Sequence, residues 1–369
     1  MQDPASSLLV PRVRVISLLG TLLVQRCVPF MKRFAVGSDV MLSRTPVRVS
    51  FCGGGTDLQS FWSAHPEGGA VTSLAISNYI YVFLNRRFES SIRVAYTKTE
   101  IVESIDDVEH DLVREALREA ELTSHIEVVT VADIPSRGSG LGSSSTLTVG
   151  LLNAAHGWNG QQLGPEDLAR GACDIEINRL SQPIGLQDQY AAAYGGLNHI
   201  VFHQDGTVSV EPIVISDDLV ARIADEFVLI WTGRHRQATG ILEEQNQRTS
   251  SSASMNRLIR MREQAVEVRD AFQKGDLVAI GSLLDEGWRL KRDLSSNITD
   301  ADIDALHGEV MACGATGCKL LGAGGGGFLL AHGGADMESK VRSRLPAAKC
   351  MPLRLDPHGS ILMKVTTDD

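Results

Sequence analysis

The sequence predicts an α+β protein with two domains and mixed sheets. Its 369 residues are enough for two domains of ordinary size, and 43% apolar residues supply a substantial core. Short β-branched runs and helical patterns follow one another without a regular strand–helix alternation, which argues against a doubly wound parallel sheet. A buried-strand pattern at 228–232 opens a helix-rich second unit near Phe227.

The first unit is expected to be rich in strands. Val47–Cys52 is a β-branched run that ends at three glycines, Gly53 to Gly55. Pro165 favours the first turn of a helix, and Pro183 and Gly185 end that helical pattern. The other strands expected in this unit are 70–84, 92–96, 125–134, 197–202 and 207–213. The expected helices are 107–120, 146–158, 164–180 and 187–194.

The second unit is expected to be mainly helical. Two strands within Cys318–Gly333 are joined by a second glycine loop, Gly322 to Gly327. Helical patterns cover 236–247, 253–274, 276–294, 300–313 and 335–344, and two last strands are expected near 350–355 and 360–366.

Composition restricts the possible partners. A net charge of −10 argues against a nucleic-acid partner, which would require a basic surface. The six cysteines are scattered without a CxxC pair, so we expect reduced thiols and a cytoplasmic protein. The apolar run at 13–25 is too short to span a membrane. Residues 1–40 are therefore expected to be a misassigned or disordered extension, with Met41 near the true start.

The segment Pro135–Thr146 (PSRGSGLGSSST) predicts an anion site. It lies between a β-branched run and a helical pattern, so its glycines would bring backbone N–H groups close to a ligand at a helix N-terminus. The serines Ser143 to Ser145 can cap the helix or bind metal and phosphate oxygens. The alternative, a flexible linker, is disfavoured by the strong signals on both sides. The loop matches neither GxxxxGK[ST] nor GxGxxG.

Four glycine-bounded motifs occur in order. They are TPVRVSFCGGGTD (45–57), GLGSSST (140–146), GLQDQYAAAYGG (185–196) and GATGCKLLGAGGGGF (314–328). Together they resemble the GHMP kinases over residues 44 to about 366. Within that superfamily, GGGTD, SSSTLTVGLLNA and QDQYAA are most similar to the branch of D-glycero-D-manno-heptose 7-phosphate kinases.

The resemblance implies a fold and a reaction. An N-terminal domain like domain 2 of ribosomal protein S5 would occupy 41–222, and a ferredoxin-like C-terminal domain would occupy 223–369. ATP, Mg²⁺ and a small-molecule sugar phosphate would meet in the cleft between them, without nucleic acid or membrane. The γ-phosphoryl group would pass to the anomeric hydroxyl. A homodimer stays open.

The resemblance also implies catalytic residues. Asp188 matches the family's aspartate that accepts the hydroxyl proton, and its alternative role is a helix cap. Arg48 would stabilise charge on the phosphoryl group or lower the pKa of Asp188; the alternative is a solvated strand-edge arginine. Glu176, beside an apolar stripe, would bind magnesium together with Ser144; its alternative is a surface pair with Arg179.

Ligand-binding residues follow from the same motifs. Asp57 would bind sugar hydroxyls, against the alternative of a turn aspartate, and Gly54 and Gly55 would admit the sugar. ATP would lie on Gly138, Ser139, Gly140, Leu141, Gly142, Ser143, Ser144 and Ser145. Gly324 and Gly325 would line the substrate side, unless their loop is a plain hairpin turn. For a distal sugar phosphate we favour Arg236 among Arg137, Arg179, Arg234, Arg236 and Lys319.

Two departures limit the assignment. The galactokinase motif GEHTDY is absent, which disfavours galactose, and Pro135 lies one residue further from GLG than in relatives, which leaves the role of Arg137 open. A kinase for fucose or an octose phosphate is one alternative. A catalytically silent nucleotide- or sugar-binding regulator is another, disfavoured because Asp188, Glu176 and Ser144 are all present. A dinucleotide-dependent oxidoreductase is disfavoured by the missing GxGxxG.

Overall fold

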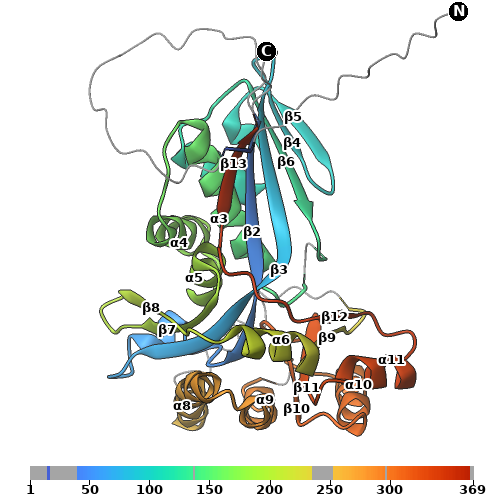
Figure 1. Ribbon diagram of the computed structural model, residues 1–369. Coiled ribbons are helices and arrows are strands. Elements are labelled where there is room, and N and C mark those ends of the chain that lie inside the picture. Colours follow the sequence, from blue (N-terminus) through green and yellow to red (C-terminus); the bar gives the residue numbers. More distant parts are fainter. Residues whose placement is uncertain (1–14, 17–39, 136–137, 235–251, 296, 366–369) are drawn as a thin grey trace, which may run out of the picture.

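The structure is a computed structural model that describes residues 15–16, 40–135, 138–234, 252–295 and 297–365 (Figure 1). Its strands are β1 (Val15–Ile16), β2 (Val40–Cys52), β3 (Gly69–Arg86), β4 (Ile92–Ala95), β5 (Thr99–Val102), β6 (Ile126–Ala132), β7 (Leu197–Phe202), β8 (Val208–Pro212), β9 (Phe227–Trp231), β10 (Gly317–Leu320), β11 (Phe328–His332), β12 (Cys350–Pro352) and β13 (Ile361–Val365). Its α-helices are α1 (Gln59–Trp62), α2 (Asp111–Glu119), α3 (Ser143–Trp158), α4 (Pro165–Cys173), α5 (Gln187–Tyr194), α6 (Asp217–Glu226), α8 (Ser252–Lys274), α9 (Leu277–Arg292), α10 (Ala301–Ala312) and α11 (Met337–Arg344).

The larger sheet is built around two long strands, β2 and β3. In the described residues its order is β1-β13-β2-β3-β6-β4-β5, and β7 and β8 extend it from the other half of β3. All pairs are antiparallel except β4 with β6. The mixed sheet agrees with the predicted α+β class, which is confirmed. Figure 1 shows α3, α4 and α5 together on one face of this sheet.

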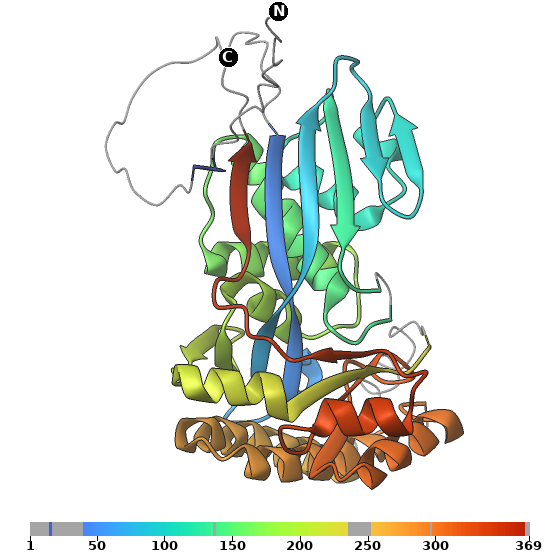
Figure 2. The ribbon, with the colours of Figure 1, turned by 45° about the vertical axis from the view of Figure 1, so that its right-hand side comes forward.

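The second sheet has the order β10-β11-β9-β12 in the described residues. Its central strand β9 is buried on both faces: Phe227 and Leu229 enter one apolar cluster, while Val228 and Ile230 enter another. Figure 2 shows α8 and α9 beneath the lower ends of β2 and β3, with α6 and α11 alongside the small sheet. The long strands therefore reach into the second unit.

One apolar cluster joins the two units. Phe51, at the end of β2, is fully buried and meets Phe227 and Phe272 edge-on, with ring centroids 5.7 and 4.9 Å apart. The same cluster contains apolar side chains of β3, α6 and α9.

The domain division at 222/223 stays a prediction. Most of the predicted extension, 1–14 and 17–39, lies outside the described residues, as does the helix predicted at 236–247.

The structure extends one predicted strand. β2 begins at Val40 instead of Val47, and the register with β3 shifts between Pro46 and Val47. A proline has no N–H for the ladder, so it is tolerated at such a bulge and does not end the strand. In the described residues, no helix is both long and apolar enough to cross a membrane.

We expect Phe51→Ala to lower the free energy of unfolding by about 3–5 kcal/mol, because it removes a fully buried ring where the units meet. Urea denaturation measures this. Phe88→Ala is the matched control, since Phe88 is fully exposed. A loss no larger than that of the control would show that the two units do not depend on this ring.

Candidate active site

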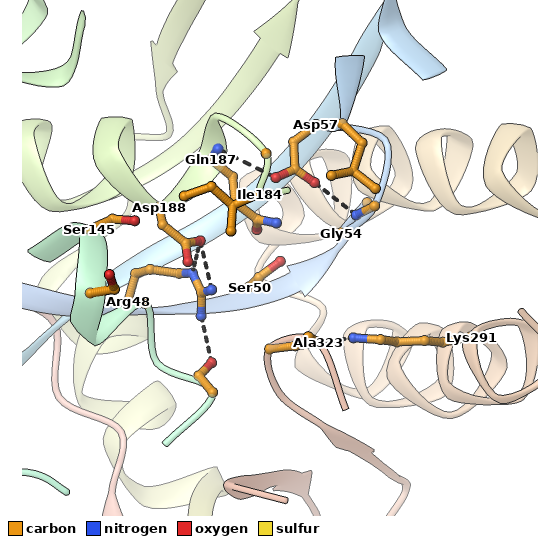
Figure 3. Close-up of a pocket in the computed structure, with 18 of the residues that line it drawn as sticks. Arg48, Ser50, Gly54, Asp57, Ser145, Ile184, Gln187, Asp188, Lys291 and Ala323 are labelled. Atoms are coloured by element: carbon orange, nitrogen blue, oxygen red, sulfur yellow. Dashed lines mark hydrogen bonds and ion pairs between the residues drawn. The ribbon is translucent and has the colours of Figure 1, made fainter. Parts of the chain in front are cut away.

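A cavity of about 640 Å³ lies where the two units meet. Its wall combines the end of β2, the loop before α3, the start of α5, and side chains of α8, α9 and β10 (Figure 3). Segments far apart in the sequence thus share one space. All four glycine-bounded motifs contribute to it, through the members Arg48, Gly54, Gly140, Ser144, Asp188, Lys319 and Gly322.

The loop before α3 lines the cavity with three glycines. Gly138, Gly140 and Gly142 all have positive φ, between 65° and 76°, and Gly142 is the N-cap of α3. A Cβ on Gly140 would lie 2.6 Å from the carbonyl oxygen of Leu321. The open N-terminus of α3 favours a negative ligand. Ser139, Ser143, Ser144 and Ser145 also line the cavity, whereas the Leu141 side chain lies in the apolar core.

The second glycine loop closes against the first. The N–H of Phe328 donates to the carbonyl oxygen of Ser139 over 3.0 Å, and a Cβ on Gly322 would lie 2.5 Å from Cα of Gly140. Gly322 and Ala323 line the cavity. Gly324 and Gly325, predicted to bind substrate, do not line this cavity of the described residues. They pack against Ile298 instead, whose carbonyl oxygen accepts from the N–H of Gly325 over 2.8 Å.

Asp188 and Arg48 form an ion pair at the start of α5. Nε and Nη2 of Arg48 lie 2.7 and 2.6 Å from Oδ1 of Asp188, and Nη1 donates to the carbonyl oxygen of Gly140 over 2.7 Å. Arg48 is almost fully buried, while the Asp188 side chain is 24% exposed. The guanidinium is therefore not a solvated strand-edge group. It fixes Asp188 beside the glycine loop with one carboxylate edge open to the cavity.

Glu176 lies beneath the N-terminus of α3. It belongs to a π-helical turn, Asp174–Arg179, and is fully buried. Its Oε1 accepts from Oγ of Ser144 over 2.8 Å, and its Oε2 accepts from Nε2 of Gln189 over 2.7 Å. Burial raises the pKa of Glu176 to about 7. The alternative surface pair is wrong, because Arg179 pairs with Asp174 and Glu119.

Asp57 shapes the loop at the end of β2. Its Oδ1 accepts from the N–H of Gly55 over 2.8 Å, and it is nearly fully buried. Burial and the neighbouring Asp188 raise the pKa of Asp57. Gly53 packs against Ala70, whose carbonyl oxygen would be 2.0 Å from an added Cβ. Around Gly54 the nearest atom to an added Cβ is 3.7 Å away, so this glycine leaves room at the cavity wall.

Some cavity residues escape the motif-based prediction. Lys291 of α9 and Gln264 of α8 are buried and line the cavity, as do Ser50 and Gln187. The sequence does carry a signal for Lys291. It continues the spacing of the buried residues Ile280, Leu284 and Trp288, so a lysine takes the next position of an apolar stripe.

The predicted cations have different surroundings. Lys319 lines the cavity and is nearly fully buried. Arg234 pairs with Asp300 and Asp302 at the surface. Arg236 and Arg137 lie outside the described residues.

No cluster of three or more His, Cys, Asp or Glu able to hold a metal occurs in the described part of the chain, so a metal here would need ligand phosphates and water.

The fold and this cavity define a small-molecule kinase. Residues 108–196 match the model of the GHMP kinases N terminal domain, and 268–348 match that of the GHMP kinases C terminal domain. The chain thus contains both the N-terminal and the C-terminal domain of the GHMP kinases. The predicted fold and the predicted kinase class are thereby confirmed, and ATP is the family's phosphoryl donor.

Three known proteins illustrate the similarity. The chain is 29% identical over 299 residues to D-glycero-alpha-D-manno-heptose 7-phosphate kinase of Campylobacter jejuni, covering 78% of this chain and 87% of that protein. It is 28% identical to L-fucokinase/L-fucose-1-P guanylyltransferase of Bacteroides fragilis, covering 79% of this chain but 34% of that protein. A crystal structure of a D-glycero-D-manno-heptose 1-phosphate kinase from Bacteroides thetaiotaomicron has a TM-score of 0.72 at 26% identity, covering 87% and 98%.

We expect the metal-free protein to lose stability as the pH rises from 4.5 to about 7. The native pKa of Glu176, about 7, exceeds the 4.5 of a solvated glutamate, so the native state binds more protons in this window. Glu176→Gln removes this loss and should melt a few degrees above wild type at pH 8 in EDTA.

Differential scanning fluorimetry across pH 4.5 to 8 provides the comparison, with the exposed Glu103→Gln as control. If the melting temperatures of Glu176→Gln and wild type changed with pH in the same way, the pKa of Glu176 would not be raised in the folded protein.

Proposed function

We propose that the chain transfers the γ-phosphoryl group of ATP to the anomeric hydroxyl of a sugar phosphate. The preferred substrate is D-glycero-D-manno-heptose 7-phosphate, and the product is the 1,7-bisphosphate for nucleotide-heptose synthesis. The observation that carries this proposal is the Asp188–Arg48 ion pair beside the glycine loop at the N-terminus of α3. It places a carboxylate and an anion site in the same cavity.

The nucleotide would lie on the loop from Gly138 to Ser145. Backbone N–H groups at the start of α3 would receive the phosphates, since their internal partners are missing and the helix dipole adds positive potential. The side chain of Leu141 lies in the apolar core and supports the loop from there. Only the backbone of Leu141 would therefore contact the nucleotide.

Ser144 and Glu176 fit a magnesium ion. Both supply oxygen atoms, and the hydrogen-bond partners of the buried Glu176 in the described residues, Ser144, Ser145 and Gln189, are neutral. A cation there would relieve the cost of burying the carboxylate. When bound, magnesium neutralises phosphate charge and orients the triphosphate. Glu176 must lose its proton to take this role.

Asp188 would accept the proton of the attacking hydroxyl. As the bond from the sugar oxygen to the γ-phosphorus forms, the bond to the β,γ-bridging oxygen breaks, and ADP leaves with the electron pair. Arg48 holds the carboxylate by two N–H groups and keeps it directed into the cavity. Asp57 lines the cavity near Gly54, where the wall leaves room for a ligand, and would bind ring hydroxyls.

The substrate class rests on the comparisons and on the cavity together. Two of the similar proteins carry heptose phosphates in their names, at the 7- and the 1-position, and the third acts on fucose. The buried lysines Lys291 and Lys319 favour a phosphorylated sugar over a neutral one such as fucose. A silent regulator is disfavoured because the ion pair and the Ser144–Glu176 contact are both intact.

We expect Asp188→Asn to reduce kcat by at least about a hundredfold, the scale of a lost general base. The affinity for ATP should persist, because Asp188 does not belong to the glycine loop. Coupled ADP release measures turnover, and Asp218→Asn on the exposed start of α6 is the control. Turnover close to wild type would remove Asp188 from the chemistry.

The substrate itself is tested by an ADP-release screen over phosphorylated and free sugars, followed by ³¹P NMR of the product. We expect heptose 7-phosphate to give the highest kcat/KM and a new phosphate signal from the anomeric oxygen. No turnover with any heptose phosphate, alongside turnover of another sugar, would reject the heptose assignment and leave the kinase class in place.

A further inference from the structure

Two buried lysines face the cavity from the second unit. Lys291 comes from α9 and Lys319 from β10; they are 8% and 7% exposed, and both line the cavity wall. Burial lowers the pKa of Lys291 to about 7 and that of Lys319 to about 8. Lysine is rarely buried without a partner, so two of them on one wall require an explanation.

Their hydrogen bonds all go to neutral backbone atoms. Nζ of Lys319 donates to the carbonyl oxygens of Ser50 and Phe51 over 3.0 and 2.8 Å, and Nζ of Lys291 donates to that of Gly322. In the described part of the chain, neither ammonium group pairs with a carboxylate. An ammonium group has three N–H donors, so one donor of Lys319 and two of Lys291 have no acceptor among the described residues.

The electrostatic balance of this wall calls for an anion. Besides burial, the guanidinium of Arg48 lowers the pKa of both lysines, and Lys319 also lowers the pKa of Lys291. Asp57 and Asp188 offset part of this effect at Lys291. Arg48 is already paired with Asp188, and burying an ammonium group without a close counter-charge of its own is unfavourable. A ligand that carries two negative charges and three oxygen acceptors would match both the charge and the donors.

The position of Lys291 separates it from the proposed chemistry. Figure 3 shows Lys291 directed toward Ala323, across the site from the Arg48–Asp188 pair, with Ser50 between them. Oγ of Ser50 and Oε1 of Gln264 are buried polar atoms without a hydrogen-bond partner in the described residues. Polar side-chain atoms with hydrogen-bonding capacity to spare therefore line the same cavity as the ion pair and Lys291, as a sugar ring requires.

We propose that Lys291 and Lys319 bind the phosphate group that the sugar substrate already carries. The reacting hydroxyl then lies at Asp188, the ring lies along Ser50 and Gln264, and the distal phosphate lies on the two lysines. This inference rests on the proposed function and deepens it. It replaces Arg236 as the favoured distal-phosphate residue by two residues that line the cavity.

A second source of phosphate is the nucleotide. Gly322, which accepts from Lys291, touches Gly140 of the nucleotide loop, so the γ-phosphate of ATP is the competing ligand. The two cases differ in kinetics. A lysine that binds the substrate's phosphate changes the KM for sugar phosphate, whereas one that binds the γ-phosphate changes the KM for ATP or lowers kcat with every sugar.

The test compares Lys291→Met with wild type on heptose 7-phosphate and on the same heptose without phosphate. We expect the KM for heptose 7-phosphate to rise about tenfold to a hundredfold, the range for a hydrogen bond to a charged group. The preference for phosphorylated over free sugar should fall by the same factor, and the KM for ATP should stay within about twofold. Lys274→Met, at the exposed end of α8, is the control for charge.

An unchanged preference, or an equal loss of kcat on both sugars, overturns the proposal in favour of the γ-phosphate. Methionine is one atom shorter than lysine but fills most of the same space and removes a buried charge, so Lys291→Met should melt no lower than wild type. Lys319→Met is the second variant and should show the same loss of preference.

A binding experiment separates this proposal from the proposed function. Enzyme saturated with ADP and magnesium is titrated calorimetrically with inorganic phosphate, so that the nucleotide loop is filled. Wild type should bind phosphate at least about tenfold more tightly than Lys291→Met. Equal binding overturns the role of the lysines. If wild type phosphorylates only free sugars while Lys291→Met loses phosphate binding, the substrate assignment fails and the anion site stands.

Discussion

The site depends on the direct backbone contact between the two glycine loops. Gly140 and Gly322 approach so closely that a Cβ on either would lie within 2.6 Å of backbone atoms of the other loop. This contact connects the N-terminus of α3 to the strands of the second unit. Through it, Arg48 reaches the carbonyl oxygen of Gly140 and Lys291 reaches that of Gly322. The groups proposed to catalyse the transfer and to bind anions are thereby fixed relative to each other by main chain.

The two units contribute different charged groups to the cavity. The first unit contributes Asp57 and the Arg48–Asp188 pair, and the second contributes the ammonium groups of Lys291 and Lys319. Glu176 is buried next to Ser144 and does not itself line the cavity within the described residues. Burial moves the pKa of Glu176 upward and that of Lys291 downward, toward neutrality in both cases. Each shift means that the charged form of the group is disfavoured in the folded protein relative to the unfolded chain. Such strain is expected where phosphates and a metal supply the missing charges.

The sequence could predict those parts of the site whose geometry is local. The glycines and the serines at a helix start identify the loop before α3 without any tertiary information. The position of Glu176 beside an apolar stripe likewise indicates that this carboxylate needs a partner. Lys291 was missed because a helical lysine is normally solvated, and only packing against β10 shows that its end is enclosed. Gly324 and Gly325 were predicted to line the substrate side, but the path of their loop depends on a contact with Ile298. Motif spacing in the sequence cannot reveal such a contact.

Chemistry and specificity occupy different kinds of structure in this protein. The groups proposed to act on the transferred phosphoryl lie in glycine-bounded loops and at the first turns of α3 and α5, where backbone geometry tolerates little change. The groups proposed to hold the distal phosphate lie on α9 and β10, and Gln264 of α8 joins Ser50 and Asp57 of the first unit in the proposed contact with the ring. A side chain on a helix face can change without moving the loops, so the acceptor sugar can be altered while the transfer machinery is kept. This separation explains how one family fold accommodates acceptors that differ in size and charge.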